Sequence, residues 1–368
     1  MDKLEEVLEI VANVLEKPVD SDEDLESQGM DSLNLMHLMY QLEITYNIQF
    51  VDDDLRKINF KTIYNICCLL ESKLEEHQEN EKDLSAPFIN IGNQKIKCIL
   101  RGGCDLRRTE PFLSLGTNLC VQSELTYVSP TGVIIRNDHL EILKNSLILT
   151  EEQKQEQIKN FPFYDEKVFN TALFNSNYDV VIISMLHDYY AGLYRNKYDK
   201  DLLIAFGDYS SPSSDIENWH AEFEQKISDQ YWEGRGKINN EKMASFYENF
   251  EFIGGVDRDY FINQLHWLRK HMNPNAMLIL LNGSHTDIKK TLLLDRAERH
   301  KNMNSWLEEA VHSMPDTYLV DVNKYIKSQD DLLDTIGHYR RDHYKNIAYE
   351  IIKIIKKKYS NSNLNLDK

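Results

Sequence analysis

The apolar pattern of this chain changes character near residue 80, and this change constrains the fold more than any other feature. Residues 3–16 and 33–42 space their apolar side chains three and four positions apart, which predicts amphipathic helices. Beyond Pro87, short apolar runs alternate with longer helical stretches, a pattern typical of parallel βα units. A chain of 368 residues can build two domains with separate cores. We therefore predict an all-α domain followed by an α/β domain.

The first domain is predicted to be a four-helix bundle over residues 1–77. Asp31 and Ser32 suit the start of its second helix, because short polar side chains cap helix N-termini. From 78 to 88 the chain is polar and lacks periodicity, which indicates a linker. The helices are expected at residues 3–16, 33–42, 50–57 and 63–74.

The second domain is predicted over residues 89–358 as a three-layer α/β fold, in which helices flank a doubly wound sheet of five parallel strands. Residues from about 189 to 250 exceed what one crossover needs, so we expect an insertion that covers the carboxyl edge of the sheet. Residues 359–368 are expected to form a disordered tail. The strands are expected at residues 96–100, 118–122, 180–185, 277–281 and 318–322.

The segment Gly29-Met30-Asp31-Ser32-Leu33 places a serine hydroxyl at a helix start, where backbone N–H groups and the helix dipole favour a phosphodiester. This motif and the helix pattern resemble acyl carrier protein domains over residues 1–77. The resemblance implies that 4′-phosphopantetheine is attached covalently to Ser32 by a phosphopantetheinyl transferase. It also implies a partner enzyme that activates or loads acyl groups. The alternative is that Asp31 and Ser32 only cap the helix.

Charge and composition indicate which partners the protein binds and in which compartment it works. The net charge is −18, and residues 1–80 alone contain 19 acidic and 6 basic side chains. Such a field disfavours nucleic acid and anionic membranes and favours partners with basic patches, although it also serves solubility. The acidic start at residues 1–6 and the lack of a long apolar window predict a cytoplasmic protein without membrane insertion. Five cysteines, an odd number, fit reduced thiols.

A glycine turn follows the first predicted strand. The residues Arg101-Gly102-Gly103-Cys104 lead into a predicted helix and thereby expose a nucleophile, while residues 333–345 supply a late cluster of Asp and His. Strand, glycine-turn nucleophile and C-terminal Asp/His cluster together resemble the SGNH (GDSL-type) hydrolase superfamily over residues 90–357. This resemblance implies a five-stranded parallel sheet between helices, which agrees with the predicted strands.

The superfamily carries a serine where this chain carries Cys104. A cysteine thiolate is a good nucleophile and would form a thioester. The nearby Arg101, Arg107 and Arg108, with the helix N-terminus, are expected to favour the thiolate. The alternative is that Cys104 is a small packed residue, the role that we predict for the other four cysteines, Cys67, Cys68, Cys98 and Cys120.

The resemblance also implies the remaining catalytic roles. His338 aligns with the general base, with His343 as the rival base. Asp334 would orient the imidazole of His338, and Asp330, Asp331 or a backbone carbonyl are the alternatives. The oxyanion donors of the superfamily follow strands two and three, where this chain carries Ser123 and His187. Four further histidines lack zinc-ligand spacing, so we predict no metal and a surface location for them; they are His266, His271, His300 and His312.

Together the two resemblances predict a carrier-dependent acyltransferase. The acyl group would move from phosphopantetheine on Ser32 to Cys104, and then to an alcohol, amine or thiol of a small-molecule or glycan acceptor. Two alternatives remain: a built-in thioesterase or esterase that releases the acyl group to water, and a non-catalytic scaffold that recognises the carrier and its cargo. Cysteine favours transfer, because exchange between two thioesters is reversible and the acceptor decides the outcome.

Overall fold

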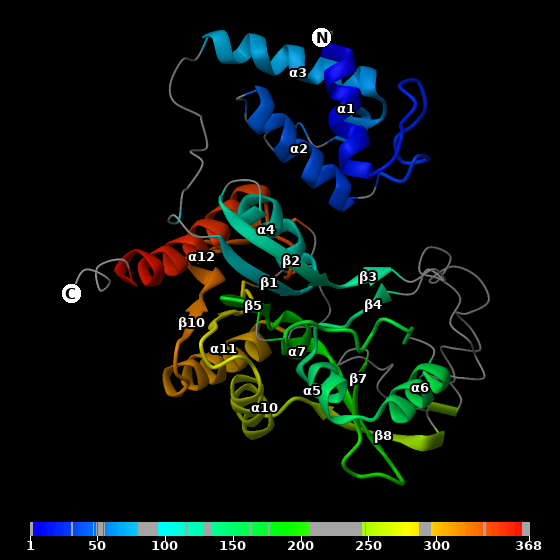
Figure 1. Cartoon of the computed structure of the whole chain (residues 1–368), viewed down its shortest axis with the longest axis vertical. Coiled ribbons are helices and arrows are strands. Elements are labelled where there is room, and N and C mark those ends of the chain that lie inside the picture. Colours follow the sequence, from blue (N-terminus) through cyan, green and yellow to red (C-terminus); the bar gives the residue numbers. More distant parts are fainter. Residues whose placement is uncertain are drawn as a thin grey trace. The chain divides into compact units, whose positions relative to one another are not determined.

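The chain forms two compact units in the computed structural model. The first unit contains residues 1–95, 107–120 and 340–368, and the second contains residues 96–106 and 121–339 (Figure 1). The residues that the structure describes are 3–30, 32–46, 48, 50, 54, 56–79, 91, 95–114, 117–128, 134–161, 164–175, 177–206, 245–246, 248–286, 296–333 and 336–362. The predicted boundaries of the domains and of the linker stay predictions, since residues 80–90 lie outside this description.

The N-terminal region is helical, as predicted. Three of its four predicted helices are α-helices, the expected short third turn at residues 50–57 lies partly outside the described residues, and a 3-10 turn begins at Lys57. Apolar side chains of all three α-helices form one core, including the fully buried Val11, Leu38, Leu42 and Ile66. The elements are α1 (Lys3–Leu15), α2 (Ser32–Tyr46), η2 (Lys57–Phe60) and α3 (Ile63–Glu79).

Five strands form one sheet, and each lies where the apolar runs predicted a strand. The strand order is β10-β9-β5-β1-β2, and the β1–β5, β5–β9 and β9–β10 pairs are parallel. The second strand extends three residues beyond its predicted end at residue 122. The strands are β1 (Ile96–Gly102), β2 (Leu119–Leu125), β5 (Val180–Ser184), β9 (Met277–Leu281) and β10 (Thr317–Val320).

This strand order gives the sheet a topological switch point. From β1 the chain continues to β2 on one side, and it later reaches β5 on the opposite side of β1. The crossovers leaving the carboxyl ends of β1 and β5 therefore diverge, which opens a crevice where ligands bind in doubly wound folds. The α/β region thus directs attention to the residues that follow β1 and β5.

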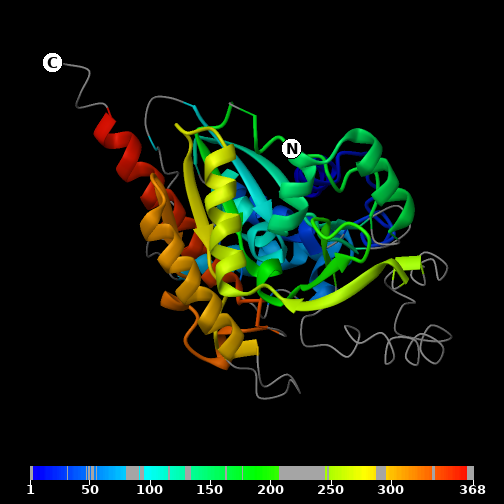
Figure 2. The ribbon, with the colours of Figure 1, turned by 90° about the horizontal axis from the view of Figure 1, so that it is seen from below.

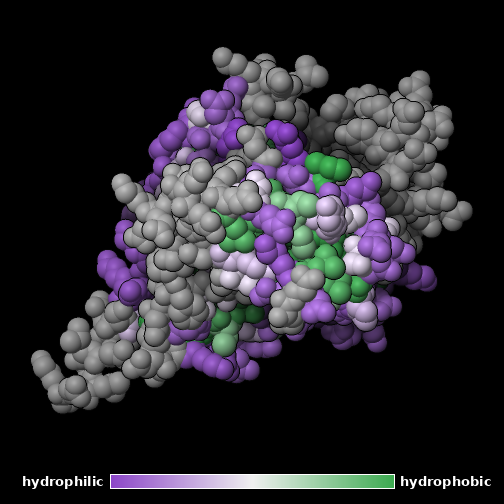
Figure 3. Space-filling model, turned by 90° about the horizontal axis from the view of Figure 1, so that it is seen from above, coloured by the Kyte–Doolittle hydropathy of each residue, from purple (hydrophilic) through white to green (hydrophobic). Residues whose placement is uncertain are grey.

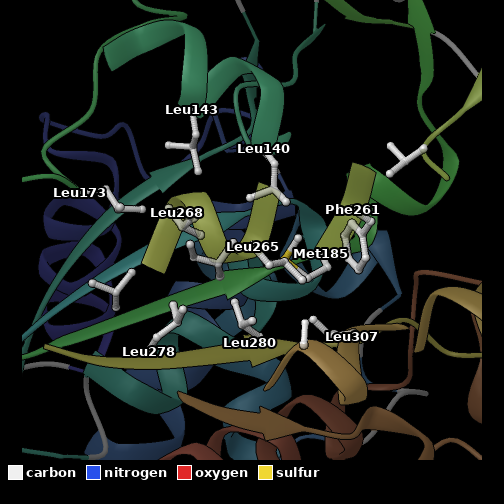
Figure 4. Close-up of a cluster of buried hydrophobic side chains, with 14 of the residues drawn as sticks. Leu140, Leu143, Leu173, Met185, Phe261, Leu265, Leu268, Leu278, Leu280 and Leu307 are labelled. Carbon is white, nitrogen blue, oxygen red and sulfur yellow. The ribbon is translucent and has the colours of Figure 1, made fainter. Parts of the chain in front are cut away.

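Both faces of the central strands β5 and β9 are buried. Side chains of one face, including Val181 on β5 and Leu278 and Leu280 on β9, pack against helices α5, α10 and α11 (Figure 4). Helices α10 and α11 lie beside each other along this face (Figure 2). The helices of the α/β region are α4 (Cys104–Ser114), α5 (Leu140–Ile148), α6 (Glu151–Asn160), α7 (Leu186–Tyr190), α10 (Arg258–His271), α11 (Arg296–Ser313) and α12 (Arg341–Ser362), with the 3-10 turns η4 (Val322–Lys324) and η5 (Gln329–Asp331).

The predicted insertion contains a second, antiparallel sheet of three strands in the order β7-β6-β8. Its aromatic side chains, among them Tyr194, Phe246 and Phe250, form a separate core. Residues 207–244 of the insertion lie outside the described residues. The strands are β6 (Gly192–Asn196), β7 (Leu203–Phe206) and β8 (Phe250–Gly255), and a short hairpin joins β3 (Tyr127–Val128) to β4 (Ile134–Ile135).

The C-terminal helix is longer than predicted. Helix α12 continues to Ser362, so the first four residues of the expected tail, 359–362, are helical, and residues 363–368 lie outside the description. No helix in the described part of the chain is long and apolar enough to cross a membrane. The face drawn in Figure 3 is largely hydrophilic, with a smaller group of exposed apolar residues near its middle.

Candidate functional site

The serine of the carrier motif is the first residue of helix α2. Gly29, three residues earlier, has a φ of +93°, a conformation that glycine adopts without the steric cost of a side chain. Its carbonyl accepts a hydrogen bond from the Asn34 side chain at 3.2 Å, which ties the loop to the first turn of the helix. Ser32 therefore stands at the positive end of a helix dipole, where a phosphodiester is favoured.

Cys104 is the first residue of helix α4, directly after the turn that ends β1. The predicted glycine turn is confirmed, and close packing requires it at Gly102. A Cβ at Gly102 would lie 2.8 Å from Leu106 Cδ1 and 2.9 Å from Ser184 Cβ. Because Ser184 ends β5, this contact brings the Cys104 turn to the switch point. The thiol is partly buried.

Asp105 links the start of α4 to the end of β5. Its carboxylate accepts a hydrogen bond from the Ser184 hydroxyl and one from the Leu106 backbone N–H at 2.8 Å. Burial raises its pKa to about 6, although these hydrogen bonds oppose the rise. The carboxyl is thus positioned by both strands of the switch point.

His187 lies in the short helix α7 that follows β5, and it faces a carboxylate. Its Nδ1 is 3.1 Å from Asp138 Oδ1, and the Thr126 hydroxyl donates to the same oxygen at 3.3 Å. Burial would raise the pKa of Asp138, but His187 and Arg136 outweigh burial and hold it below its usual range. Burial lowers the pKa of His187. The pair is therefore a neutral imidazole beside an ionised carboxylate.

Arg136 connects this pair to Cys104. Its Nη1 donates to the Tyr190 hydroxyl, and its guanidinium carbon lies 5.2 Å from the centre of that ring. The Tyr190 ring in turn is 5.3 Å from the ring of His187. Burial would lower the pKa of the guanidinium, but three acidic neighbours, Tyr190, Asp138 and Cys104, raise it. The Arg136 guanidinium is partly buried, and the charge of Cys104 is one of the three that favour its charged form.

Two of the arginines that lie near Cys104 in the sequence, Arg101 and Arg108, interact with other side chains. Arg101 is fully buried and pairs with Glu124 at 2.6 Å, and it also donates to the Asn137 carbonyl. The guanidinium of Arg108 lies over the Tyr344 ring, 5.7 Å from its centre. The charge of Arg101 is thus compensated within the interior by Glu124, and its expected effect on the Cys104 thiolate stays a prediction.

Strand β2 corrects the predicted position of one oxyanion donor. Ser123 lies inside β2, which continues to Leu125, so it does not follow the strand as predicted. Thr126 follows the strand instead. Its backbone N–H donates to the Gly102 carbonyl at 3.0 Å, and its hydroxyl reaches Asp138. The strand is three residues longer than predicted, so Thr126 rather than Ser123 lies beside the glycine turn before Cys104.

The loop that carries His338 lies against α7. A Cβ at Gly337 would stand 2.8 Å from Leu186 Cδ2, so this loop passes the residue before His187. His338 is partly buried, and its carbonyl accepts a hydrogen bond from the Leu333 N–H at 2.9 Å. Asp334 lies outside the described residues. The roles of His338 and Asp334 stay predictions.

The alternative acids and bases have other contacts. The Asp331 carboxylate accepts hydrogen bonds at 2.8 Å from the backbone N–H groups of Lys327 and Ser328, and so closes its own 3-10 turn. His343 is buried in α12, with Nε2 3.9 Å from Asp342. These contacts give Asp331 a structural function within its loop.

A second His–Asp pair borders the first. His139 Nε2 is 3.4 Å from Asp188 Oδ1, and the two histidine rings of the neighbouring pairs are 5.5 Å apart. His139 Nδ1 accepts the Glu141 N–H at 3.0 Å and thereby caps helix α5. Burial raises the pKa of Asp188 well above its usual value and lowers that of His139 well below. This pair is neutral on both sides.

Several packing predictions need correction. Cys67 and Cys98 are buried as predicted. Cys68 and Cys120 are exposed, because they lie on the solvent-facing side of their helix and strand. His300 is buried rather than on the surface, and burial lowers its pKa to about 4. The described residues hold no group of three or more His, Cys, Asp or Glu side chains arranged for a metal ion.

Sequence reasoning missed Asp138 and Arg136. Asp138 and Arg136 lie in the connection between β4 and α5, which carries no recognisable motif. Adjacent acidic and histidine residues at Asp138-His139 and His187-Asp188 were a possible signal, because two such dipeptides offer two pairings. Only the fold shows which partner each residue takes.

Comparison with known proteins identifies the N-terminal region. Residues 5–70 match the family model described as the phosphopantetheine attachment site. No curated protein matches the chain. The matched segment contains Ser21, Ser27 and Ser32, and among them Ser32 begins a helix in the described residues, which agrees with the predicted attachment to Ser32. A domain of this kind requires a phosphopantetheinyl transferase and partners that load acyl groups. The N-terminal region of this chain is therefore a carrier domain that bears 4′-phosphopantetheine covalently on a serine.

Proposed function

We propose that this protein is a carrier-dependent acyltransferase, in which Cys104 receives an acyl group from the carrier domain and passes it to a small-molecule or glycan acceptor. One observation supports this proposal above the others. Cys104 begins a helix at the switch point of a doubly wound sheet, and it interacts electrostatically with the partly buried guanidinium of Arg136. A helix N-terminus and a nearby cation both favour a thiolate, the reactive form of cysteine.

The chemistry follows from these groups. Bound 4′-phosphopantetheine supplies a thiol that holds acyl groups as thioesters. The Cys104 thiolate attacks the thioester carbon, a new S–C bond forms, and the donor sulfur leaves as a thiol once it has taken up a proton. An acceptor alcohol, amine or thiol then attacks the Cys104 thioester, loses its proton to a base, and releases the Cys104 thiolate. In this proposal Arg136 stabilises the negative charge of both tetrahedral intermediates.

The resemblance to the SGNH superfamily supplies the acid–base roles in this proposal. It assigns the general base to His338 and the orienting acid to Asp334. The contact of Gly337 with Leu186 supports a place for the His338 loop beside the segment that follows β5. Release of the acyl group to water would need the same nucleophile, so hydrolysis is an alternative fate of the Cys104 thioester rather than a different site.

Intact-protein mass spectrometry tests the proposal. The full-length protein is converted to the holo form, its pantetheine thiol is loaded with a panel of acyl groups, and the acyl adducts are located by proteolysis. We expect a second adduct on Cys104 that moves to an added acceptor. Loss of the acyl group without an acceptor would indicate hydrolysis. A loaded Ser32 that stays inert would contradict both enzymatic fates and favour a scaffold.

Two variants make the measurement specific. Cys104→Ala should abolish the second adduct without affecting the loading of Ser32. Cys120→Ala is the matched control, because Cys120 is an exposed thiol of the same chain and the proposal gives it no role. An adduct that moves to acceptor as fast in Cys104→Ala as in the unaltered protein would contradict the assignment of the nucleophile.

A further inference from the structure

We infer that His187 and Asp138 form the proton-accepting pair of the Cys104 site, with His187 Nε2 taking the thiol proton and Asp138 positioning the imidazole. This inference rests on the proposed function and replaces the oxyanion role that the sequence suggested for His187. It also competes with His338 for the role of base.

The tautomer of His187 decides whether its Nε2 can accept or donate a proton. Its buried Nδ1 faces Asp138 at 3.1 Å, and an ionised carboxylate can only accept a hydrogen bond. A neutral imidazole carries one proton, which this carboxylate draws to Nδ1. Nε2 then presents a lone pair and cannot donate to an oxyanion. His187 is therefore set up as a base rather than as an oxyanion donor.

The placement of Asp138 connects this pair to the nucleophile. A Cβ at Gly103, the residue before Cys104, would lie 3.5 Å from Asp138 Oδ2. Among the described residues, the only hydrogen bonds or ion pairs of the Asp138 side chain are those with Thr126 and His187, so this carboxylate is held between β2 and α7. Asp138 therefore bridges the glycine turn and the imidazole.

Charges around the pair set its protonation. His187 faces a carboxylate, a guanidinium, a phenol and a second imidazole, which belong to Asp138, Arg136, Tyr190 and His139. Asp138 also feels the charges of Arg101, Asp105 and Asp188. Burial lowers the pKa of His187, so the imidazole is neutral and able to accept a proton near neutral pH.

The proton transfer balances within the chain. The Cys104 S–H bond breaks, its electrons remain on sulfur as the thiolate, and the proton moves to His187 Nε2. The imidazolium that forms is stabilised by the Asp138 carboxylate, and it returns the proton to the departing thiol of the acyl donor. No oxidant, metal or further reactant is needed.

The test is the pH dependence of cysteine alkylation in the full-length protein. Iodoacetamide labelling of each cysteine is followed by peptide mass spectrometry, with the exposed Cys68 and Cys120 as internal standards and the fully buried Cys98 as a reporter of unfolding. A free thiol titrates at about 8.5, and a thiol at a helix N-terminus or beside a cation or a histidine titrates at about 3.5–7.5, so the variants decide which group is responsible. We expect Cys104 to fall in the lower range and the exposed cysteines near the ordinary value.

Two variants should move the Cys104 midpoint upward by about 1 pH unit or more, toward that of a free thiol. His187→Gln keeps an amide that can bond Asp138 but lacks a basic nitrogen, and Asp138→Asn removes the charge that fixes the tautomer. His338→Gln should leave this midpoint in place. If His187→Gln exposes Cys98 to labelling, Asp138→Asn decides the question.

The outcomes separate this inference from the proposed function. An unchanged midpoint in a folded His187→Gln variant overturns the inference, whatever His338→Gln does, and so does a Cys104 midpoint equal to that of Cys120. The acyl-transfer measurement does not depend on which histidine accepts the proton. A shifted midpoint together with an inert loaded Ser32 would retain the pair and reject the transferase.

Discussion

Two His–Asp pairs of the same composition lie side by side in the α/β region, and they differ in charge. In one pair His187 Nδ1 faces Asp138, whose pKa lies below its usual range. In the other, His139 Nε2 faces Asp188, whose pKa lies well above it. All four side chains are buried, so burial alone does not explain the difference.

Neighbouring charge explains it. His187 and, to a smaller extent, Arg136 lower the pKa of Asp138, whereas the carboxylates of Asp138 and Glu141 raise that of Asp188. In the second pair, His139 Nδ1 also accepts a hydrogen bond from the Glu141 N–H, which caps helix α5. One pair is therefore charged and directed to the site, and the other is neutral and structural. The same two residue types acquire different functions from their surroundings.

The largest expected effect is on the rate of acyl transfer, and it comes from replacing the Asp138 carboxylate with an amide. Asp138→Asn should lower the rate of acyl transfer by about 10²- to 10⁴-fold, the range over which general acid–base groups contribute. Asp188→Asn is the matched control, because an amide resembles the protonated acid that this site already holds. Single-turnover transfer from the loaded carrier, with the free energy of unfolding measured in urea, compares the two variants. Equal losses of rate would contradict the functional division between the pairs.

Local pattern was enough to predict the five strands of the main sheet and the α-helices of the N-terminal region. The central strands β5 and β9 are continuous apolar runs, and buried parallel strands have this composition. The glycine turn before Cys104 was equally local. The predicted end of β2 was too early, because residues 123–125 are polar or only partly buried and leave no apolar signal. The displacement of Ser123 from its predicted place follows from that error.

The pairing of Asp138 with His187 could not be predicted from the sequence, for a different reason. Asp138 and His187 are separated by 48 intervening residues, and each is adjacent to a residue that belongs to the other pair. Sequence order cannot show that Asp138 faces His187 rather than His139, its own neighbour. The low pKa of Asp138 depends on His187 and Arg136, and these electrostatic effects exist only in the folded chain.

A third buried carboxyl gives an intermediate case with a smaller effect. The pKa of Asp105 is raised from 3.8 to about 6 by burial, so the folded state favours its protonated form. Its stabilising contribution is complete below pH 3.8 and is lost as the pH rises through about 6. Asp105→Asn should therefore match the unaltered protein at low pH and exceed its stability at pH 7 by at most about 3 kcal/mol, at about 1.36 kcal/mol per pKa unit. Urea unfolding across this pH range measures the difference. A variant that loses stability at pH 7 would show that the ionised carboxylate, rather than the acid, is the favoured form in the fold.

The smallest effect isolates the structural role of the neutral pair. His139 Nδ1 accepts the Glu141 N–H at 3.0 Å, so His139→Ala removes an N-terminal cap of α5 and should cost about 1 kcal/mol of unfolding free energy. His139→Asn is the matched control, because asparagine is a favoured N-cap and should restore much of this loss. Urea denaturation measures both, and the alkylation midpoint of Cys104 should stay that of the unaltered protein. A midpoint that moves with His139→Asn as far as with His187→Gln would show that both imidazoles take part in proton transfer, because capping geometry alone has no means of changing the acidity of a thiol on another helix.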